Sequence, residues 1–109
     1  MKLLRGMIVV GAGKGDFSGK PRPFIVVQSD LFANHATISL CPVTSVISST
    51  NLFRVSLEAS PDTGLVRDSE IQVDKLDTLR RDEISQIIGM TPITTMTRVD
   101  DALRRWLEL

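Results

Sequence analysis

The chain has 109 residues, enough for a hydrophobic core of its own, and we expect one domain over residues 1–109. Hydrophobic residues make up 42% and charged residues 24%, a composition that disfavours intrinsic disorder, collagen-like repeats and coiled coils. Thirteen basic and thirteen acidic side chains cancel, so a nucleic-acid partner held by a broad basic surface is also disfavoured.

Short apolar segments separated by turn residues predict strands in the first half of the chain. The first strand is expected over 7–10, before a glycine-rich loop over 11–22 in which basic side chains predominate. A second strand is expected over 24–28, where four successive β-formers predict burial on both faces or a place in a barrel wall. Alternating polar and apolar residues predict a half-buried third strand over 36–41.

The second half of the chain predicts two more strands and then helix. The strands are expected over 53–57 and 69–73, with a turn at 60–64 between them. Acidic residues near the start of 81–88 and the glycine that follows predict a short helix there. We therefore expect a mainly β fold, a small barrel or sandwich, with helices packed against it.

A long helix is predicted at the C-terminus. Thr91 is expected to cap it, and Pro92 suits its first position. Core packing is the simpler role for its apolar face, and a dimer or partner interface is the alternative for Trp106. The face comprises Ile93, Met96, Val99, Leu103, Trp106 and Leu107.

Arg22 stands between Pro21 and Pro23 at the start of the second strand. Each proline fixes its own φ and disfavours a helical backbone in the residue before it, so Arg22 is expected to be extended and rigid. A fixed guanidinium at the mouth of a strand suits phosphate binding. The same sequence also suits protection of a strand edge from aggregation, and both interpretations remain open on spacing alone.

The remaining motifs exclude several classes of site. Cys41 is the only cysteine and His35 the only histidine, so an intrachain disulfide, a cysteine cluster and multi-histidine metal sites are excluded, and a reducing cytoplasm is expected. The segment 11–16 matches neither the phosphate-loop pattern nor the glycine pattern of dinucleotide-binding loops. No apolar run is long enough for a membrane helix.

One sparse constellation of polar residues is left. Strand ends of a small barrel converge on one rim, and we expect these residues to meet there. Thr44 suits hydrogen bonding more than proton transfer, which leaves acid–base chemistry open. The constellation comprises Arg22, Thr44, Ser45, Lys14, Lys20, Asp74 and Lys75.

The chain resembles the MazF/PemK toxin family of prokaryotic toxin–antitoxin systems. An arginine–proline strand followed at this distance by Pro-Val-Thr-Ser is fairly specific to that family. The similar segments are 5–10, 19–30, 41–45, 69–79 and 88–90, in the family's order.

The resemblance implies a fold and an activity. It implies a homodimer of small SH3-like β-barrels (CcdB/MazF-like), each with a long C-terminal helix, acting as an endoribonuclease on single-stranded RNA without a metal or cofactor. Arg22 and Thr44 match the family's catalytic residues. The RNA 2′-hydroxyl would attack the adjacent phosphorus and leave a 2′,3′-cyclic phosphate and a 5′-hydroxyl. The residues expected to contact RNA are Lys14, Phe17, Lys20, Pro23, Ser45, Asp74 and Lys75.

The resemblance also implies a partner, an antitoxin whose acidic, disordered tail folds onto the toxin and blocks its groove. Met7 and Lys75 stand where many relatives have aspartate and glutamine. We expect the first to affect strand or dimer structure, and the second to affect RNA sequence preference.

Two alternatives lie within the same superfamily. The segment 27–30 and Trp106 also resemble CcdB-like gyrase poisons, which bind an enzyme and catalyse nothing, although those proteins end in Trp-Gly-Ile. The other alternative is an inactive relative retained for antitoxin binding or regulation.

Overall fold

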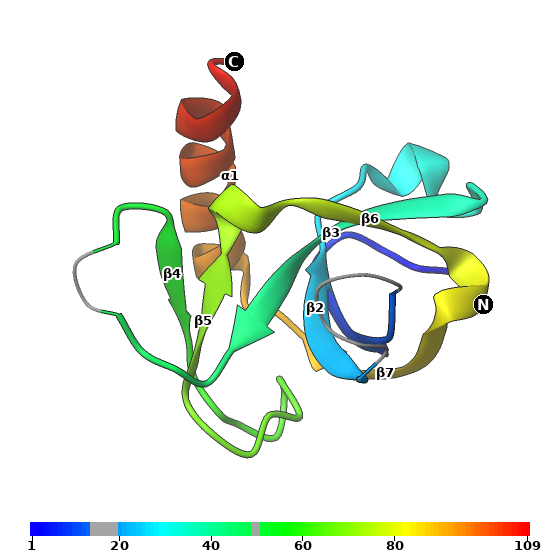
Figure 1. Cartoon of the computed structure of the whole chain (residues 1–109), viewed down its shortest axis with the longest axis horizontal. Coiled ribbons are helices and arrows are strands. Elements are labelled where there is room, and N and C mark those ends of the chain that lie inside the picture. Colours follow the sequence, from blue (N-terminus) through cyan, green and yellow to red (C-terminus); the bar gives the residue numbers. More distant parts are fainter. Residues whose placement is uncertain (14–19, 49–50) are drawn as a thin grey trace.

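The computed structural model describes residues 1–13, 20–48 and 51–109, and within them seven strands form one antiparallel sheet (Figure 1). The strands follow the order β4-β5-β3-β2-β1-β7, and β6 pairs with β3. The strands are β1 (Met7–Gly11), β2 (Arg22–Val26), β3 (Thr37–Thr44), β4 (Arg54–Leu57), β5 (Ser69–Gln72), β6 (Asp77–Arg80) and β7 (Ile84–Met90). Single 3₁₀ turns at Asp30–Phe32, Val73–Lys75 and Arg81–Glu83 and the helix α1 (Ile93–Leu107) complete the described elements.

Strand β3 organises the sheet because it has two partners in succession on one side. Leu40 lies opposite Asp77 of β6, and Val43 lies opposite Ile71 of β5. The 3₁₀ turn Val73–Lys75 carries the chain from β5 to β6. The predicted mainly β fold with a C-terminal helix is confirmed. In the described residues no pairing joins β4 to β7, so the sheet does not close into a hydrogen-bonded barrel.

Both faces of the central strands are buried, as the unbroken apolar run in the second strand predicts. Ile8 and Ile25 belong to a cluster that packs beneath α1, whereas Val9, Phe24 and Val26 belong to a second cluster on the opposite face. The period of two along a strand sends neighbouring side chains to opposite faces. Burial on both sides fixes the register of β1 and β2, since a slip of one residue would exchange the two sets.

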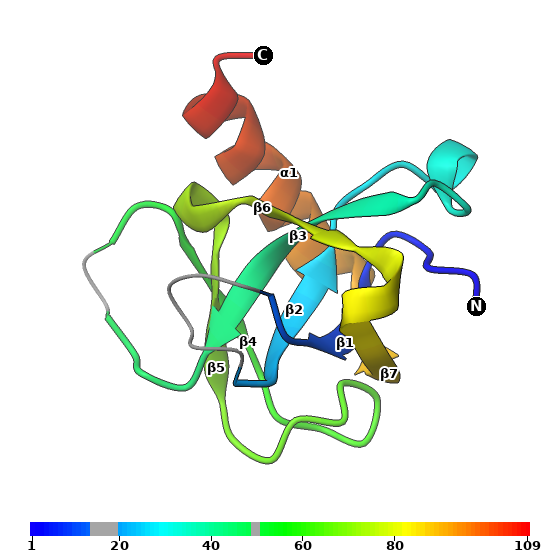
Figure 2. The same ribbon diagram turned by 45° about the vertical axis from the view of Figure 1, so that its right-hand side comes forward.

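Helix α1 packs on the sheet beside β4 and the 3₁₀ turn Val73–Lys75 (Figures 1 and 2). Met96, Val99 and Ala102 are buried against the sheet, but Ile93 is 86% exposed, so the predicted apolar face packs only in part. Trp106 remains half exposed with its ring packed edge-on against Phe53. No helix in the described part of the chain is long and apolar enough to cross a membrane.

Two predictions about helix are wrong. Thr91 does not cap α1, because the N-cap is Pro92 and no side chain accepts a capping bond. The segment 81–88 is not a short helix: only the 3₁₀ turn forms at its start, and the chain then enters β7, which pairs with β1. Pairing with β1 satisfies a whole strand of backbone groups, which outweighs a local preference for helix.

Strand boundaries also differ from expectation near the polar constellation. β2 begins two residues early, at Arg22, and β3 continues through Pro42 to Thr44. Pro42 is tolerated in β3 because it falls between the stretches that pair with β6 and with β5. The start of β2 and the end of β3 therefore extend to the same edge of the sheet.

Candidate active site

Arg22 and Thr44 end β2 and β3 at the same edge of the sheet. Phe24 lies opposite Pro42, so the antiparallel register continued by two residues sets Arg22 opposite Thr44. The Val27 N–H donates to the Ser39 carbonyl at 3.1 Å, so these two opposite residues form a hydrogen-bonded pair. Hydrogen-bonded and non-hydrogen-bonded pairs alternate along an antiparallel ladder, which makes Arg22 and Thr44 a non-hydrogen-bonded pair. Side chains are closest in that class, so a guanidinium and a hydroxyl from distant parts of the chain point to one place.

A pocket of about 480 Å³ contains both residues, and we call it the rim groove. Its walls come from the start of β2, from the end of β3 with the loop after it, and from the loop between β4 and β5. Both ribbon views show the β4–β5 loop at the opposite end of the molecule from the C-terminus of α1 (Figures 1 and 2). The lining residues are Arg22, Pro23, Val43, Thr44, Ser45, Val46, Leu65, Val66, Arg67 and Ser69.

The Thr44 hydroxyl is oriented by its own loop. Its Oγ1 accepts a hydrogen bond from the Val46 N–H at 3.1 Å, which uses one lone pair and leaves the hydroxyl proton for donation. Arg22 is partly buried in the extended backbone of β2, as the flanking prolines predict. The groove thus presents a cation and a hydroxyl hydrogen-bond donor, a pair suited to a phosphate oxygen.

A buried ion pair holds the segment that follows Thr44. Glu70 of β5 accepts the Ser48 N–H at 2.8 Å and pairs with Arg54 of β4 at 3.0 Å. The same Arg54 nitrogen donates to the Val46 carbonyl at 3.0 Å. Their side chains are only 15% and 7% exposed, so this network gives the groove a fixed wall.

The β4–β5 loop is also anchored. Gly64 has a φ of +69°, a left-handed conformation that favours glycine, and the Asp62 carbonyl accepts the Met90 N–H of β7 at 2.9 Å. The buried Thr63 hydroxyl donates to the Glu58 carbonyl at 3.0 Å across the loop. These contacts fix the path of the residues that form the second wall of the rim groove.

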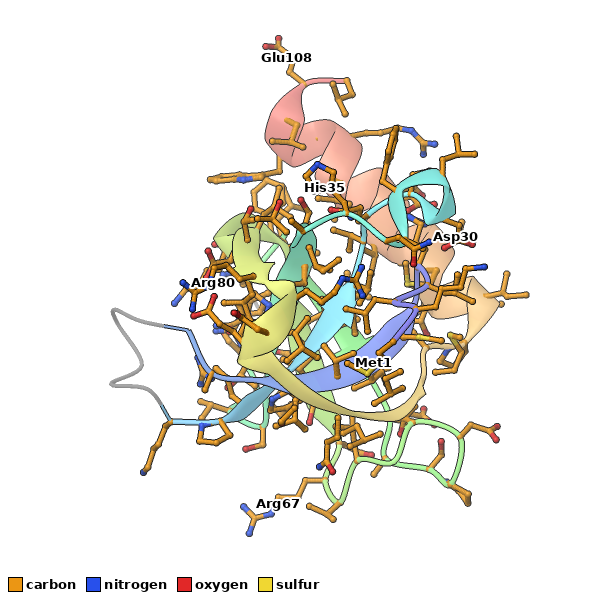
Figure 3. The ribbon with its side chains drawn as sticks, turned by 90° about the vertical axis from the view of Figure 1, so that its right-hand side faces the viewer. Met1, Asp30, His35, Arg67, Arg80 and Glu108 are labelled. Atoms are coloured by element: carbon orange, nitrogen blue, oxygen red, sulfur yellow. The ribbon has the colours of Figure 1, made fainter. Side chains whose placement is uncertain are left out.

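Arg67 is a candidate functional residue that the sequence analysis did not identify. It is exposed on the β4–β5 loop and lines the rim groove, and Figure 3 shows its side chain at the opposite end of the molecule from Glu108. A single arginine between turn residues carries no periodic signal. Only its place just before the strand at 69–73, whose first residue also lines the groove, would have indicated it.

The other predicted site residues divide into three sets. Pro23 and Ser45 lie on the rim groove. Lys20 is exposed two residues before Arg22. Lys14 and Phe17 lie outside the described residues.

The prediction that Asp74 and Lys75 share the rim with Arg22 and Thr44 is wrong. Thr44 pairs with Glu70, near the start of β5, whereas Asp74 follows the other end of that strand. From Glu70 the chain continues through Ile71 and Gln72 of β5 and then enters the 3₁₀ turn that contains Asp74, so Asp74 lies toward the other end of β5 from Thr44. Asp74 faces Cys41 instead: burial first, and then the Asp74 carboxylate, raise the pKa of the Cys41 thiol to about 12, opposed by Arg5.

The family comparison identifies a toxin family. Residues 5–107 match the model of the PemK-like, MazF-like toxin of type II toxin–antitoxin systems. The chain is 35% identical over 99 residues to a probable endoribonuclease MazF of Mycolicibacterium smegmatis, covering 91% of each chain. It is 30% identical over 102 residues to endoribonuclease MazF6 of Mycobacterium tuberculosis, covering 92% of this chain and 90% of the relative.

Solved structures share the fold. MazF of Deinococcus radiodurans superimposes with a TM-score of 0.80 at 20% identity, covering 100% of this chain and 99% of that one. A mycobacterial endoribonuclease in complex with its cognate antitoxin gives a TM-score of 0.79 at 22% identity, with coverage of 97% and 95%. At these identities the likeness establishes the architecture alone.

Proposed function

The chain belongs to the PemK-like, MazF-like family of type II toxins and is an endoribonuclease, and we propose that it cleaves single-stranded RNA in the rim groove. The observation that supports this site most strongly is the register of β2 and β3, which directs Arg22 and Thr44 to one solvent-facing pocket. Because the chain is an endoribonuclease, the gyrase-poison and inactive alternatives are set aside.

The proposed reaction is an internal transfer at phosphorus. The 2′-oxygen of the ribose forms a bond to the adjacent phosphorus, and the bond from phosphorus to the 5′-oxygen breaks. The 2′-hydroxyl loses its proton and the departing 5′-oxygen gains one, which gives a 2′,3′-cyclic phosphate and a 5′-hydroxyl. The nucleophile belongs to the substrate, so positioning and charge stabilisation by the protein are the main requirements, and we propose that no metal or cofactor takes part.

Arg22 and Thr44 have complementary roles in this proposal. The Arg22 guanidinium stabilises the additional negative charge as phosphorus becomes five-coordinate, and its fixed backbone reduces the reorganisation needed. The Thr44 hydroxyl donates to a non-bridging phosphate oxygen, since the Val46 N–H engages one of its two lone pairs and orients the oxygen while the proton remains for donation. The net proton transfer runs from the 2′-hydroxyl to the departing 5′-oxygen, and we propose that Arg22 and Thr44 are the side chains that assist it.

The rest of the rim groove would hold the strand on either side of the scissile phosphate. Arg67 suits a neighbouring phosphate, and the exposed side chains of Val46 and Val66 give apolar surface for unpaired bases. Lys14, Phe17 and Lys20 are proposed to guide the strand from the loop before β2. Asp74 and Lys75 are not included, because they follow the far end of β5.

We further propose the biological setting that the resemblance implies. Residues 1–109 act in the cytoplasm as one toxin domain that assembles as a homodimer, cleaves messenger RNA and inhibits translation and growth. A cognate antitoxin with an acidic, disordered tail neutralises it by covering the rim groove. A mycobacterial endoribonuclease of this fold has been solved with its cognate antitoxin, which supports such a partnership.

The test is cleavage of a defined single-stranded RNA by purified protein in excess EDTA, with the new ends mapped chemically. We expect 2′,3′-cyclic phosphate and 5′-hydroxyl ends, at a rate that added magnesium does not increase. Cleavage that requires a metal, or that leaves a 5′-phosphate, would contradict the proposed reaction. The Arg22→Ala protein is the control for a contaminating ribonuclease.

A further inference from the structure

Thr44 and Glu70 lie directly opposite each other on β3 and β5. Opposite residues of an antiparallel pair project their side chains to the same face of the sheet, so the Glu70 side chain lies next to that of Thr44. The register of β2 and β3 sets Arg22 on the other side of Thr44, and the three residues form a row across three strands. Glu70 does not line the rim groove, so any effect it has on the site passes through another residue.

The carboxylate of Glu70 is nearly buried, and its hydrogen bonds hold the loop that follows Thr44. Its Oε1 atom accepts the Ser48 N–H at 2.8 Å and a hydrogen bond from Arg54 Nη1 at 3.0 Å. The same Nη1 atom donates to the Val46 carbonyl at 3.0 Å. Because β3 ends at Thr44, these side-chain bonds serve the loop backbone where the strand ladder stops.

This chain of contacts ends on the Thr44 hydroxyl. Arg54 holds the carbonyl of Val46, and the Val46 N–H donates to Thr44 Oγ1 at 3.1 Å. A shift of the Val46 backbone would therefore turn the hydroxyl away from its present direction. We propose that Arg54 and Glu70 are positioning residues, which orient the Thr44 hydroxyl toward the scissile phosphate through the backbone of Val46. This inference rests on the proposed function.

The choice of a charged pair supports a positioning role over a purely structural one. A buried ion pair loses the hydration of both ions, and apolar side chains of similar volume often stabilise a fold as well or better. Apolar side chains cannot supply a donor for the Val46 carbonyl or an acceptor for the Ser48 N–H. The pair therefore gives the loop a fixed path that packing alone does not give.

The test replaces the ion pair with apolar residues in the double variant Arg54→Met with Glu70→Leu. This variant leaves no unpaired buried charge, so its thermal midpoint should stay within about 5 °C of the parent value. Affinity for an RNA with 2′-deoxyribose at the cleavage site should change less than about two-fold, whereas the single-turnover cleavage rate should fall about ten-fold. Glu70→Gln, whose amide oxygen accepts the same two bonds, should keep at least about a third of the parent rate.

Thr44→Val shows whether the pair acts through the hydroxyl. That variant has no hydroxyl to orient, so adding the double replacement to it should lower the rate by less than about two-fold. An equal ten-fold loss in both backgrounds would overturn the proposal, as would a parent rate in the double variant. A midpoint lowered by more than about 5 °C would also overturn it, because the pair would then support the fold as a whole.

Two controls complete the experiment. Asp101→Ala with Arg104→Ala removes an exposed ion pair of α1 at unchanged net charge and should keep the parent rate. Arg22→Ala on the same RNA separates this inference from the proposed function. If Arg22→Ala loses cleavage and the Arg54 and Glu70 double variant does not, the positioning role alone fails. A parent rate in Arg22→Ala would instead exclude the rim groove as the active site.

Discussion

Gly64 and Gly89 lie where the β4–β5 loop crosses β7, and neither position has room for a Cβ atom. A Cβ on Gly64 would lie 2.0 Å from the Ile88 carbonyl oxygen, and one on Gly89 would lie 2.2 Å from the Thr63 carbonyl oxygen. Both clashes involve backbone atoms, which cannot rotate away. This contact supports the loop that carries Leu65, Val66 and Arg67 to the rim groove.

We predict that Gly64→Ala lowers the free energy of unfolding by at least about 2 kcal/mol, from the left-handed backbone and the clash together. Urea unfolding followed by circular dichroism measures this change. Asp62→Ala is the matched control, since its exposed side chain can be removed while its carbonyl keeps the bond to Met90. Equal stability of the Gly64→Ala and parent proteins would show that the loop is not held at this crossing.

Arg22→Ala should reduce RNA cleavage by at least about 100-fold, because charge stabilisation at a transferring phosphate is the largest single term expected here. Arg22→Lys should recover only part of the rate, since an ammonium keeps the charge but cannot bond in a bidentate manner. The thermal midpoint should change little for a partly exposed residue at a strand end. If Arg22→Ala kept the parent cleavage rate, catalysis would have to take place at another site.

Thr44→Val and Thr44→Ser separate the hydroxyl from the shape of the side chain. Valine removes both the acceptor for the Val46 N–H and the proton proposed for the phosphate, so we expect a loss of roughly 10- to 100-fold in cleavage rate. Serine keeps the hydroxyl and should retain most of the activity. Single-turnover rates on one RNA measure both, and similar rates for the two variants would exclude a role for the hydroxyl.

The sequence predicts the individual strands of this site better than it predicts which strand ends lie close together in the fold. Alternation of polar and apolar residues locates β3 and β4, because the period of two is a property of each strand alone. β7 escapes prediction because only its pairing with β1, more than 70 residues away in the chain, decides between strand and helix. Asp74 is assigned to the wrong rim because periodicity does not reveal which end of β5 meets Thr44.

Arg67→Ala should weaken RNA binding without abolishing cleavage. If its guanidinium contacts one phosphate, the slope of log affinity against log salt should become shallower by about 1, for every RNA sequence alike. Fluorescence anisotropy with catalytically inactive Arg22→Ala protein as the background measures this slope. Arg105→Ala, at an exposed position near the end of α1 and outside the lining of the rim groove, serves as the control for general loss of positive charge.

Cys41 should make stability depend on pH in the alkaline range. Burial, reinforced by the Asp74 carboxylate, raises its pKa from 9.0 to about 12, so the folded thiol keeps its proton where the unfolded thiol loses it. The unfolded state then binds fewer protons than the folded state, and the free energy of unfolding falls as pH rises from about 9 toward 12.

The Cys41→Ala variant isolates this effect, because lysine titration is common to both proteins and the chain has no tyrosine. The stability advantage of the parent over Cys41→Ala should be constant below pH 8 and should shrink by about 1 kcal/mol between pH 8 and pH 10. Guanidinium unfolding at each pH provides the measurement, with reductant present to keep the thiol free. A difference that stays constant to pH 10 would mean that the Cys41 thiol ionises equally in both states, in conflict with its burial between the sheet and α1.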